Sequence, residues 1–136
     1  MLLDANDSQL VLVDYQARLM PVIFENEQVI ANAVRLARMA QALQVPVWAT
    51  EQMPEKLGAT TLAVLAAIDA AGGKMLAKVH FSAAQDGLCD WLRPPARKPN
   101  VGGNARSLPK HLQKAVPPPP APSRNTVVIA GCEAHV

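Results

Sequence analysis

Two patterns of apolar positions follow one another along this chain, one typical of buried strands and one of amphipathic helices. Residues 9–13 form a mainly apolar run that ends at Asp14, as expected for a strand buried on both faces. Residues 27–43 carry apolar side chains three and four positions apart, which predicts a helix with one buried face. Residues 44–50 predict a second strand, so strand, helix and strand imply a right-handed parallel crossover.

The same alternation continues further along the chain. We predict a short apolar helix over residues 60–71, a third strand over 74–79, a short helix over 86–92 and a fourth strand over 125–130. The fourth strand runs into Gly131, as strands do where parallel proteins bring a reactive side chain to a sheet edge. The pattern therefore predicts an α/β fold, a three-layer Rossmann-like parallel sheet flanked by helices.

A proline-rich stretch separates the third and fourth predicted strands. Residues 93–123 contain most of the 12 prolines, including the run 117–120, and such runs favour an extended polyproline II spacer. We interpret this stretch as a surface insertion within a single domain of residues 1–136, with one or two helical turns over 108–115. A ligand for a proline-recognising partner is the alternative.

The composition and charge of the chain argue against several classes of partner and location. The chain has 136 residues, half of them apolar, and a net charge of +2 without pattern, which suggests neither nucleic acid nor an anionic membrane as a partner. No apolar stretch approaches a membrane span, and the N-terminal region with Asp4 and Asp7 does not resemble a signal peptide. We expect the two cysteines to be free thiols and the protein to be cytoplasmic.

Two charged residues are candidates for chemistry. Asp14 follows an apolar strand at the carboxyl edge of the predicted sheet, where a partly desolvated carboxylate can accept a thiol proton. Lys78 ends the third strand, and a cation beside a thiol stabilises the thiolate. From position alone, Asp14 could equally be a helix cap or loop residue, and Lys78 could lie on an exposed strand edge.

Four segments together resemble the isochorismatase-like cysteine hydrolases, in the branch of the isochorismatase-domain-containing proteins. One is the first strand with the Asp and Gln that follow it, and the others are a Thr-Glu-Gln loop, a Lys-x-x-Phe-Ser-Ala segment and the final glycine-led segment. They occupy residues 10–16, 49–58, 78–83 and 131–136. The proline-rich insertion is longer than this family usually has.

The resemblance implies roles for these residues. Asp14 would be the general base and Lys78 the catalytic lysine, and the nucleophilic cysteine would directly follow Val136, so we expect the reading frame to continue there with cysteine. The domain would then be incomplete at its C-terminus. A cis peptide between Cys132 and Glu133 would direct backbone N–H groups toward an oxyanion.

Other residues receive subordinate roles in this interpretation. Cys132 occupies a position that is apolar in the family, so we interpret it as a packing residue and not the nucleophile. Cys89 is expected in the core. Candidates to line a pocket for a small-molecule substrate are Tyr15, Gln16, Trp48 and Phe81.

We expect no cofactor and no metal, because the metal-binding branch of this family uses an Asp-x-His that this chain lacks. We expect a homo-oligomer at full length. Two alternatives remain. One is a catalytically inactive binding domain that ends at Val136. The other is a dinucleotide-binding domain, which the absence of Gly-x-Gly-x-x-Gly after the first strand disfavours.

Overall fold

The computed structural model describes residues 2–93 and 124–132 of the chain. Within these ranges the chain forms four strands, four α-helices and one 3₁₀ helix, in the following order: β1 Ser8–Val13, η1 Met20–Val22, α1 Asn26–Ala42, β2 Val47–Gln52, α2 Pro54–Leu57, α3 Leu62–Ala70, β3 Lys74–Lys78, α4 Leu88–Leu92 and β4 Thr126–Gly131. The prediction for residues 108–115 and the insertion itself lie outside the described residues.

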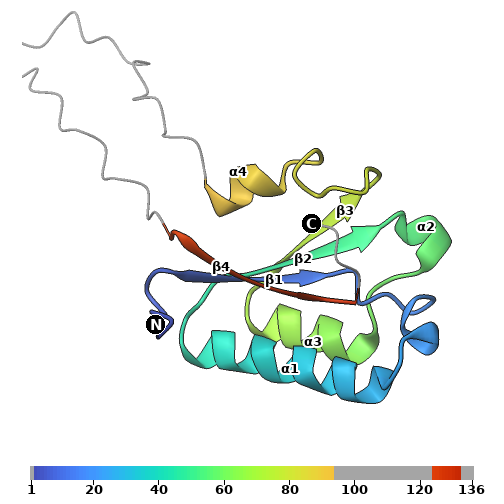
Figure 1. Ribbon diagram of the computed structural model, residues 1–136, viewed down its shortest axis with the longest axis horizontal. Coiled ribbons are helices and arrows are strands. Elements are labelled where there is room, and N and C mark those ends of the chain that lie inside the picture. The colour runs from blue at the N-terminus through green and yellow to red at the C-terminus, as the bar shows by residue number, and fades with distance from the viewer. Residues whose placement is uncertain (1, 94–123, 133–136) are drawn as a thin grey trace, which may run out of the picture.

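The four strands form one parallel sheet in the order β3-β2-β1-β4. Helices α1 and α3 lie on one face of the sheet and α4 lies on the other, as Figure 1 shows. The predicted three-layer α/β architecture is therefore confirmed. β1 is paired on both sides and apolar clusters cover both of its faces, and all six of its residues are buried. The residue that follows it therefore lies within the carboxyl edge of the sheet.

Two apolar clusters hold the layers together. The larger cluster packs alternate residues of β1 against α1 and α3, where small alanines at 33, 37 and 40 let α1 approach the sheet closely. The smaller cluster lies under α4 and includes Val11, Val13 and Leu88. The alternation of β1 between these clusters follows directly from the two-residue period of a strand.

The second strand begins three residues later than the sequence pattern suggests. Gln44 has a left-handed backbone with φ of 56°, and the Val45 N–H donates to the Ala40 carbonyl at 2.8 Å. This is the Schellman closure of a helix, with glutamine at the position that glycine commonly occupies. Residues 44–46 therefore end α1, and β2 begins only at Val47.

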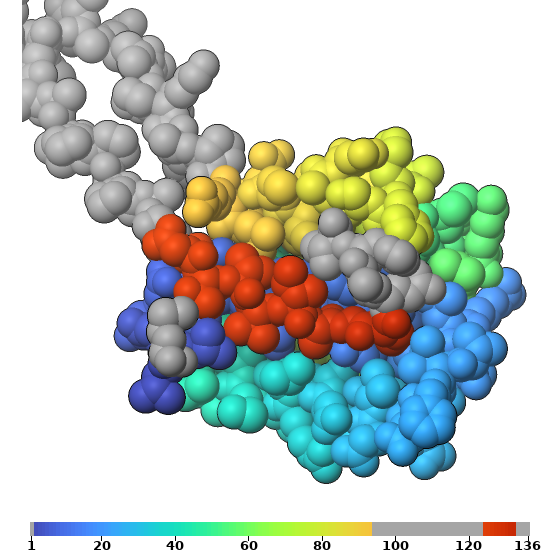
Figure 2. All heavy atoms as spheres, in the orientation of Figure 1, coloured from blue at the N-terminus to red at the C-terminus, as the bar shows by residue number. Residues whose placement is uncertain are grey.

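Strand β4 is an edge strand among the described residues. Figure 2 shows it as a band across one face of the molecule, between α1 and the segment that contains α4. Its side chains alternate between partly buried and exposed, and Val127 and Ile129 are 38% and 50% exposed.

The prediction for Cys89 is wrong, since this residue is exposed. In α4, Leu88 packs into the smaller cluster together with Leu92, one turn later. These two side chains define the buried face of the helix, and Cys89 lies off it.

Candidate active site

Asp14 lies where β1 ends, at the carboxyl edge of the sheet. Its backbone N–H donates to the Thr50 carbonyl at 3.1 Å, so pairing with β2 extends one residue beyond the strand. Its φ of 56° is left-handed, a conformation that aspartate adopts more readily than most side chains. The residue is only 4% exposed. The chain therefore turns out of the sheet at Asp14 while its carboxylate stays buried.

The Asp14 carboxylate forms a buried ion pair with Lys78. The distance from Lys78 Nζ to Asp14 Oδ2 is 2.8 Å, and the two side chains are 1% and 6% exposed, respectively. Thr50 Oγ1 donates to the other carboxylate oxygen, Oδ1, at 2.7 Å. Asp14 and Lys78 therefore meet, although β3 and β1 are separated by β2.

The Lys78 ammonium has three acceptors around it. Besides Asp14 Oδ2, it donates to Gln52 Oε1 at 2.8 Å and to the Phe81 carbonyl at 3.0 Å. An ammonium group has three N–H donors, so all three are engaged. A buried charge is tolerated only when it is paired and hydrogen-bonded in this way.

Gln16 is a buried crosslink in this structure. Its side chain is fully buried, its Nε2 donates to the carbonyls of Gln52 and Gly58, and its Oε1 accepts from the Gln52 N–H. These bonds tie the end of β1 to the end of β2. They do not support the expected place of Gln16 in a substrate pocket, which stays a prediction.

Tyr15 belongs to the opposite face of the sheet from Lys78. It packs in the larger cluster with Met20, and Cys132 packs against the same cluster. Burial, reinforced by the neighbouring Cys132, raises the pKa of the Tyr15 phenol to about 12. Its hydroxyl therefore stays protonated in neutral solution.

The two remaining pocket candidates are Phe81 and Trp48. Phe81 lies near the Asp14–Lys78 ion pair, whereas the indole of Trp48 has other partners. The Phe81 ring centroid lies 5.9 Å from Lys78 Nζ, and the residue is 55% exposed. The Trp48 indole donates to Gln9 Oε1 at 2.9 Å and its ring lies 5.7 Å from that of Trp91. These contacts describe a packing residue under α4, and the pocket role of Trp48 stays a prediction.

The end of β4 lies directly beside Asp14. Gly131 is paired with Val13, and a Cβ on Gly131 would lie 2.9 Å from the Val13 Cβ and 3.0 Å from its carbonyl oxygen. Glycine is therefore required for the two strands to approach at this point. Cys132 packs its sulfur 3.9 Å from Met20 Sδ. Glu133 and the expected cis peptide lie outside the described residues.

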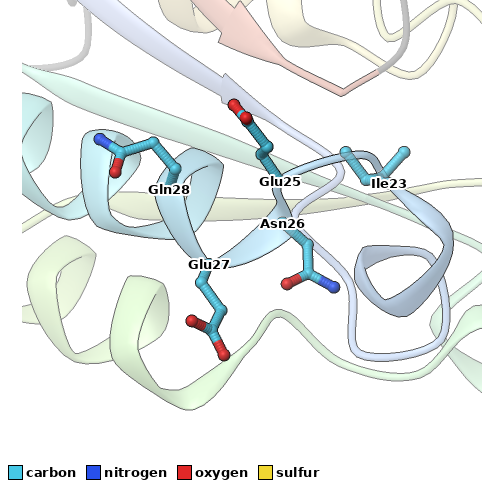
Figure 3. A pocket seen from close by; sticks show the side chains of 5 residues that line it. All are labelled: Ile23, Glu25, Asn26, Glu27 and Gln28. Carbon is cyan, nitrogen blue, oxygen red and sulfur yellow. The ribbon is translucent and has the colours of Figure 1, made fainter.

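One hollow on the described surface lies away from the ion pair. It lies at the start of α1, has a volume of about 380 Å³ and is lined by Ile23, Glu25, Asn26, Glu27 and Gln28. Figure 3 shows that Glu25 and Glu27 point in different directions, so their carboxylates do not converge on a ligand. Within residues 2–93 and 124–132, no group of three or more metal-ligating side chains is found.

Sequence reasoning missed Thr50 and Gln52, the neutral partners of the ion pair. Both stand in the Thr-Glu-Gln segment at the end of β2. Polar side chains at the buried end of a parallel strand were the available signal.

Several known proteins resemble this chain in sequence or in fold. No family model matches the chain. It is 36% identical over 80 residues to isochorismatase domain-containing protein 2 of Danio rerio, an alignment that covers 59% of this chain and 39% of that protein.

Three solved structures share the fold. The MAR1 ribonuclease of Caenorhabditis elegans matches with a TM-score of 0.62 and 26% identity, over 68% of this chain and 47% of that chain. The YcaC gene product of Escherichia coli, an octameric hydrolase of unknown specificity, matches with a TM-score of 0.57 and 22% identity, over 64% and 45%. YcaC of Pseudomonas aeruginosa, solved with covalent acrylamide, matches equally well.

The chain spans less than half the length of each of these proteins. Within the described residues, no helix is long and apolar enough to cross a membrane. The parallel sheet, the aspartate and lysine that meet at its carboxyl edge and the similarity to isochorismatase domain-containing protein 2 agree with the four sequence segments, and the chain resembles the isochorismatase-like hydrolases.

Proposed function

We propose that this chain supplies the base and the cation of a cysteine hydrolase that acts on a small amide-like substrate. The observation that carries the proposal is the buried Asp14–Lys78 ion pair beside the end of β4. A buried pair of this kind is rarely kept for stability alone, because desolvation offsets most of its attraction. Its position at the carboxyl edge of a parallel sheet is where such folds bind ligands.

The proposed nucleophile is a cysteine directly after Val136, which the last strand would deliver toward Asp14. An Asp14 oxygen takes the thiol proton, and each carboxylate oxygen retains acceptor capacity beyond its present bond. Lys78 favours the thiolate by its charge, since its N–H groups are already engaged.

The reaction then follows from these groups. The thiolate sulfur attacks the carbonyl carbon, and backbone N–H groups near Glu133 hold the oxyanion. The amine leaves with the proton from Asp14, and water hydrolyses the remaining thioester and regenerates the thiol. No metal or cofactor takes part in this proposal.

Substitutions in the full protein test these roles, with ammonia release from a panel of primary amides as the assay. Asp14→Asn and Lys78→Ala should each lower kcat/KM at least about 100-fold, because both act on the thiolate. Lys74→Ala is the matched control, since Lys74 is an exposed lysine in the same strand, and it should keep the parental rate.

A third variant tests whether Cys132 or the residue after Val136 is the nucleophile. Cys132→Ala should retain most activity because Cys132 packs against Met20. If Cys132→Ala were the inactivating change instead, the proposed nucleophile would be misplaced by five residues. Chelators should have no effect, and activity lost on chelation and restored by zinc would refute the metal-free mechanism.

Two expectations concern partners. We propose a homo-oligomer at full length, supported by the octameric YcaC relative, and sedimentation analysis of the full protein tests it.

The ribonuclease relative makes RNA the alternative substrate. Cleavage of single-stranded RNA that depends on Asp14, with no amide hydrolysis, would favour that alternative. Cytoplasmic location stays a prediction.

A further inference from the structure

Gln52 joins the lysine ammonium to the loop that follows β3. Its Oε1 accepts from Lys78 Nζ at 2.8 Å, and its Nε2 donates to the Val79 carbonyl at 2.9 Å. Rotating this amide by half a turn would place an NH₂ group against the ammonium and an oxygen against the carbonyl. Both contacts would be repulsive, so the network fixes the orientation of the amide.

The backbone of Gln52 is itself held by a buried side chain. Gln16 Oε1 accepts from the Gln52 N–H at 2.8 Å, and Gln16 Nε2 donates to the Gln52 carbonyl at 3.0 Å. The contacts therefore form a closed circuit that runs from Asp14 along the chain to Gln16, across to Gln52, on to Lys78 and back to Asp14. This circuit spans the ends of β1, β2 and β3.

The loop after β3 contributes the third acceptor of the ammonium. Asp86 accepts from the Val79 and His80 N–H groups at 3.0 and 2.9 Å, and it also contacts the His80 ring. Hydrogen bonding from His80 lowers the pKa of Asp86, so its carboxylate stays charged in neutral solution. The carbonyls of Val79 and Phe81 are thereby held toward Gln52 and Lys78.

We propose that Gln52 is a positioning residue that holds the Lys78 ammonium against Asp14 through its side-chain oxygen. The inference rests on the proposed function, because positioning matters only if Lys78 and Asp14 act together. An ammonium on a four-carbon chain has many rotamers, and small displacements of a reacting group lower rates strongly. Gln52 and the Phe81 carbonyl remove that freedom before substrate binds.

Two readouts on the full protein test the proposal, and the first needs no substrate. Exchange of the Lys78 ammonium protons with water, followed by ¹H–¹⁵N NMR, should be at least about tenfold faster in Gln52→Met, since one acceptor is lost. Gln52→Glu keeps an acceptor at the same place and should restore slow exchange. Gln41→Met is the matched control. The Gln41 side chain in α1 donates one hydrogen bond to the carbonyl of Ala70, the last residue of α3.

The second readout separates positioning from substrate binding. Gln52→Met should lower kcat about tenfold or more while KM changes less than about twofold. A raised KM with kcat unchanged would overturn the proposal, because it would make Gln52 a substrate contact. Ammonium exchange no faster in Gln52→Met than in Gln41→Met would overturn it as well. A parent protein without any hydrolysis would contradict the proposed function alone, since exchange is measured without substrate.

Discussion

The two ends of β1 bury polar side chains in different ways. At the amino end, Gln9 is 3% exposed and all its partners are neutral groups, the carbonyls of Leu92 and Arg124 and the indole of Trp48. At the carboxyl end, Asp14 and Lys78 bury opposite charges.

The hydrogen bonds are made in both networks, yet the free energy of burying them differs. A neutral amide with all its bonds made stabilises the fold modestly, whereas a buried ion pair roughly breaks even against apolar side chains of the same size. The amino end is therefore explained by stability, whereas the proposed function gives the reason for the charged pair at the carboxyl end.

The largest effect on stability should come from breaking the ion pair. Lys78→Met leaves the Asp14 carboxylate buried without a counter-ion and should lower the free energy of unfolding by about 3–5 kcal/mol. The double variant Asp14→Asn with Lys78→Met removes both charges and should recover most of that loss. Urea denaturation of the three proteins measures both steps, and a double variant no more stable than Lys78→Met would show that the pair itself stabilises the fold.

A smaller loss is expected where β4 passes Val13. Gly131→Ala places a methyl group 2.9–3.0 Å from Val13 atoms, including a backbone oxygen that cannot rotate away. We expect about 1–3 kcal/mol of destabilisation from the forced strand shift. Gly87→Ala serves as a contrast for space, since a Cβ there meets nothing within 4 Å and only its φ of 99° opposes the substitution. Equal stability of Gly131→Ala and the parent protein would refute the close approach.

Loss of the Gln9 amide at the amino end of β1 should lower the stability of the fold without changing the rate of hydrolysis. Gln9→Met leaves the Trp48 indole N–H and two carbonyls without their partner, which should cost about 1–3 kcal/mol. Hydrolysis at a temperature where the variant stays folded should match that of the parent. A large fall in kcat for folded Gln9→Met would erase the proposed division between the two ends.

The smallest effect concerns Tyr15 and vanishes at neutral pH. Its pKa is raised from 10.0 to about 12 in the folded chain, so the unfolded chain loses this proton first as pH rises. The stability that this group contributes is present below pH 10 and is lost between pH 10 and about 12. Tyr15 is the only tyrosine in the sequence, so tyrosinate absorbance follows its titration directly. A midpoint near 10 in the folded chain would contradict its burial.

The sequence predicted the fold through its apolar pattern, and family resemblance implied roles for Asp14 and Lys78. The position of Asp14 at the carboxyl edge followed because a continuous apolar run indicates a strand buried on both faces. The partners of Lys78 could not be predicted in the same way. Gln52 reaches Lys78 from a different strand, and whether an amide turns toward an ammonium depends on rotamers that no sequence period encodes.

Two other residues show the same limit. The hydrogen bonds of Gln16 were not predicted, because the β2–α2 connection supplies the backbone groups that its amide binds. Cys89 was expected in the core because its neighbours are apolar, yet helix geometry directs Leu88 and Leu92 inward and leaves Cys89 outside.

The most direct test of the central claim is to identify the thiol that acrylamide modifies in the full protein. Peptide mass spectrometry after brief exposure at neutral pH should find the label on the residue that follows Val136, and much less on Cys89 or Cys132. Asp14→Asn and Lys78→Ala should each slow this labelling at least about tenfold, because less of the thiol is ionised. Labelling that falls first on Cys132, or that proceeds at the parental rate in both variants, would contradict the claim that Asp14 and Lys78 activate a cysteine at this edge of the sheet.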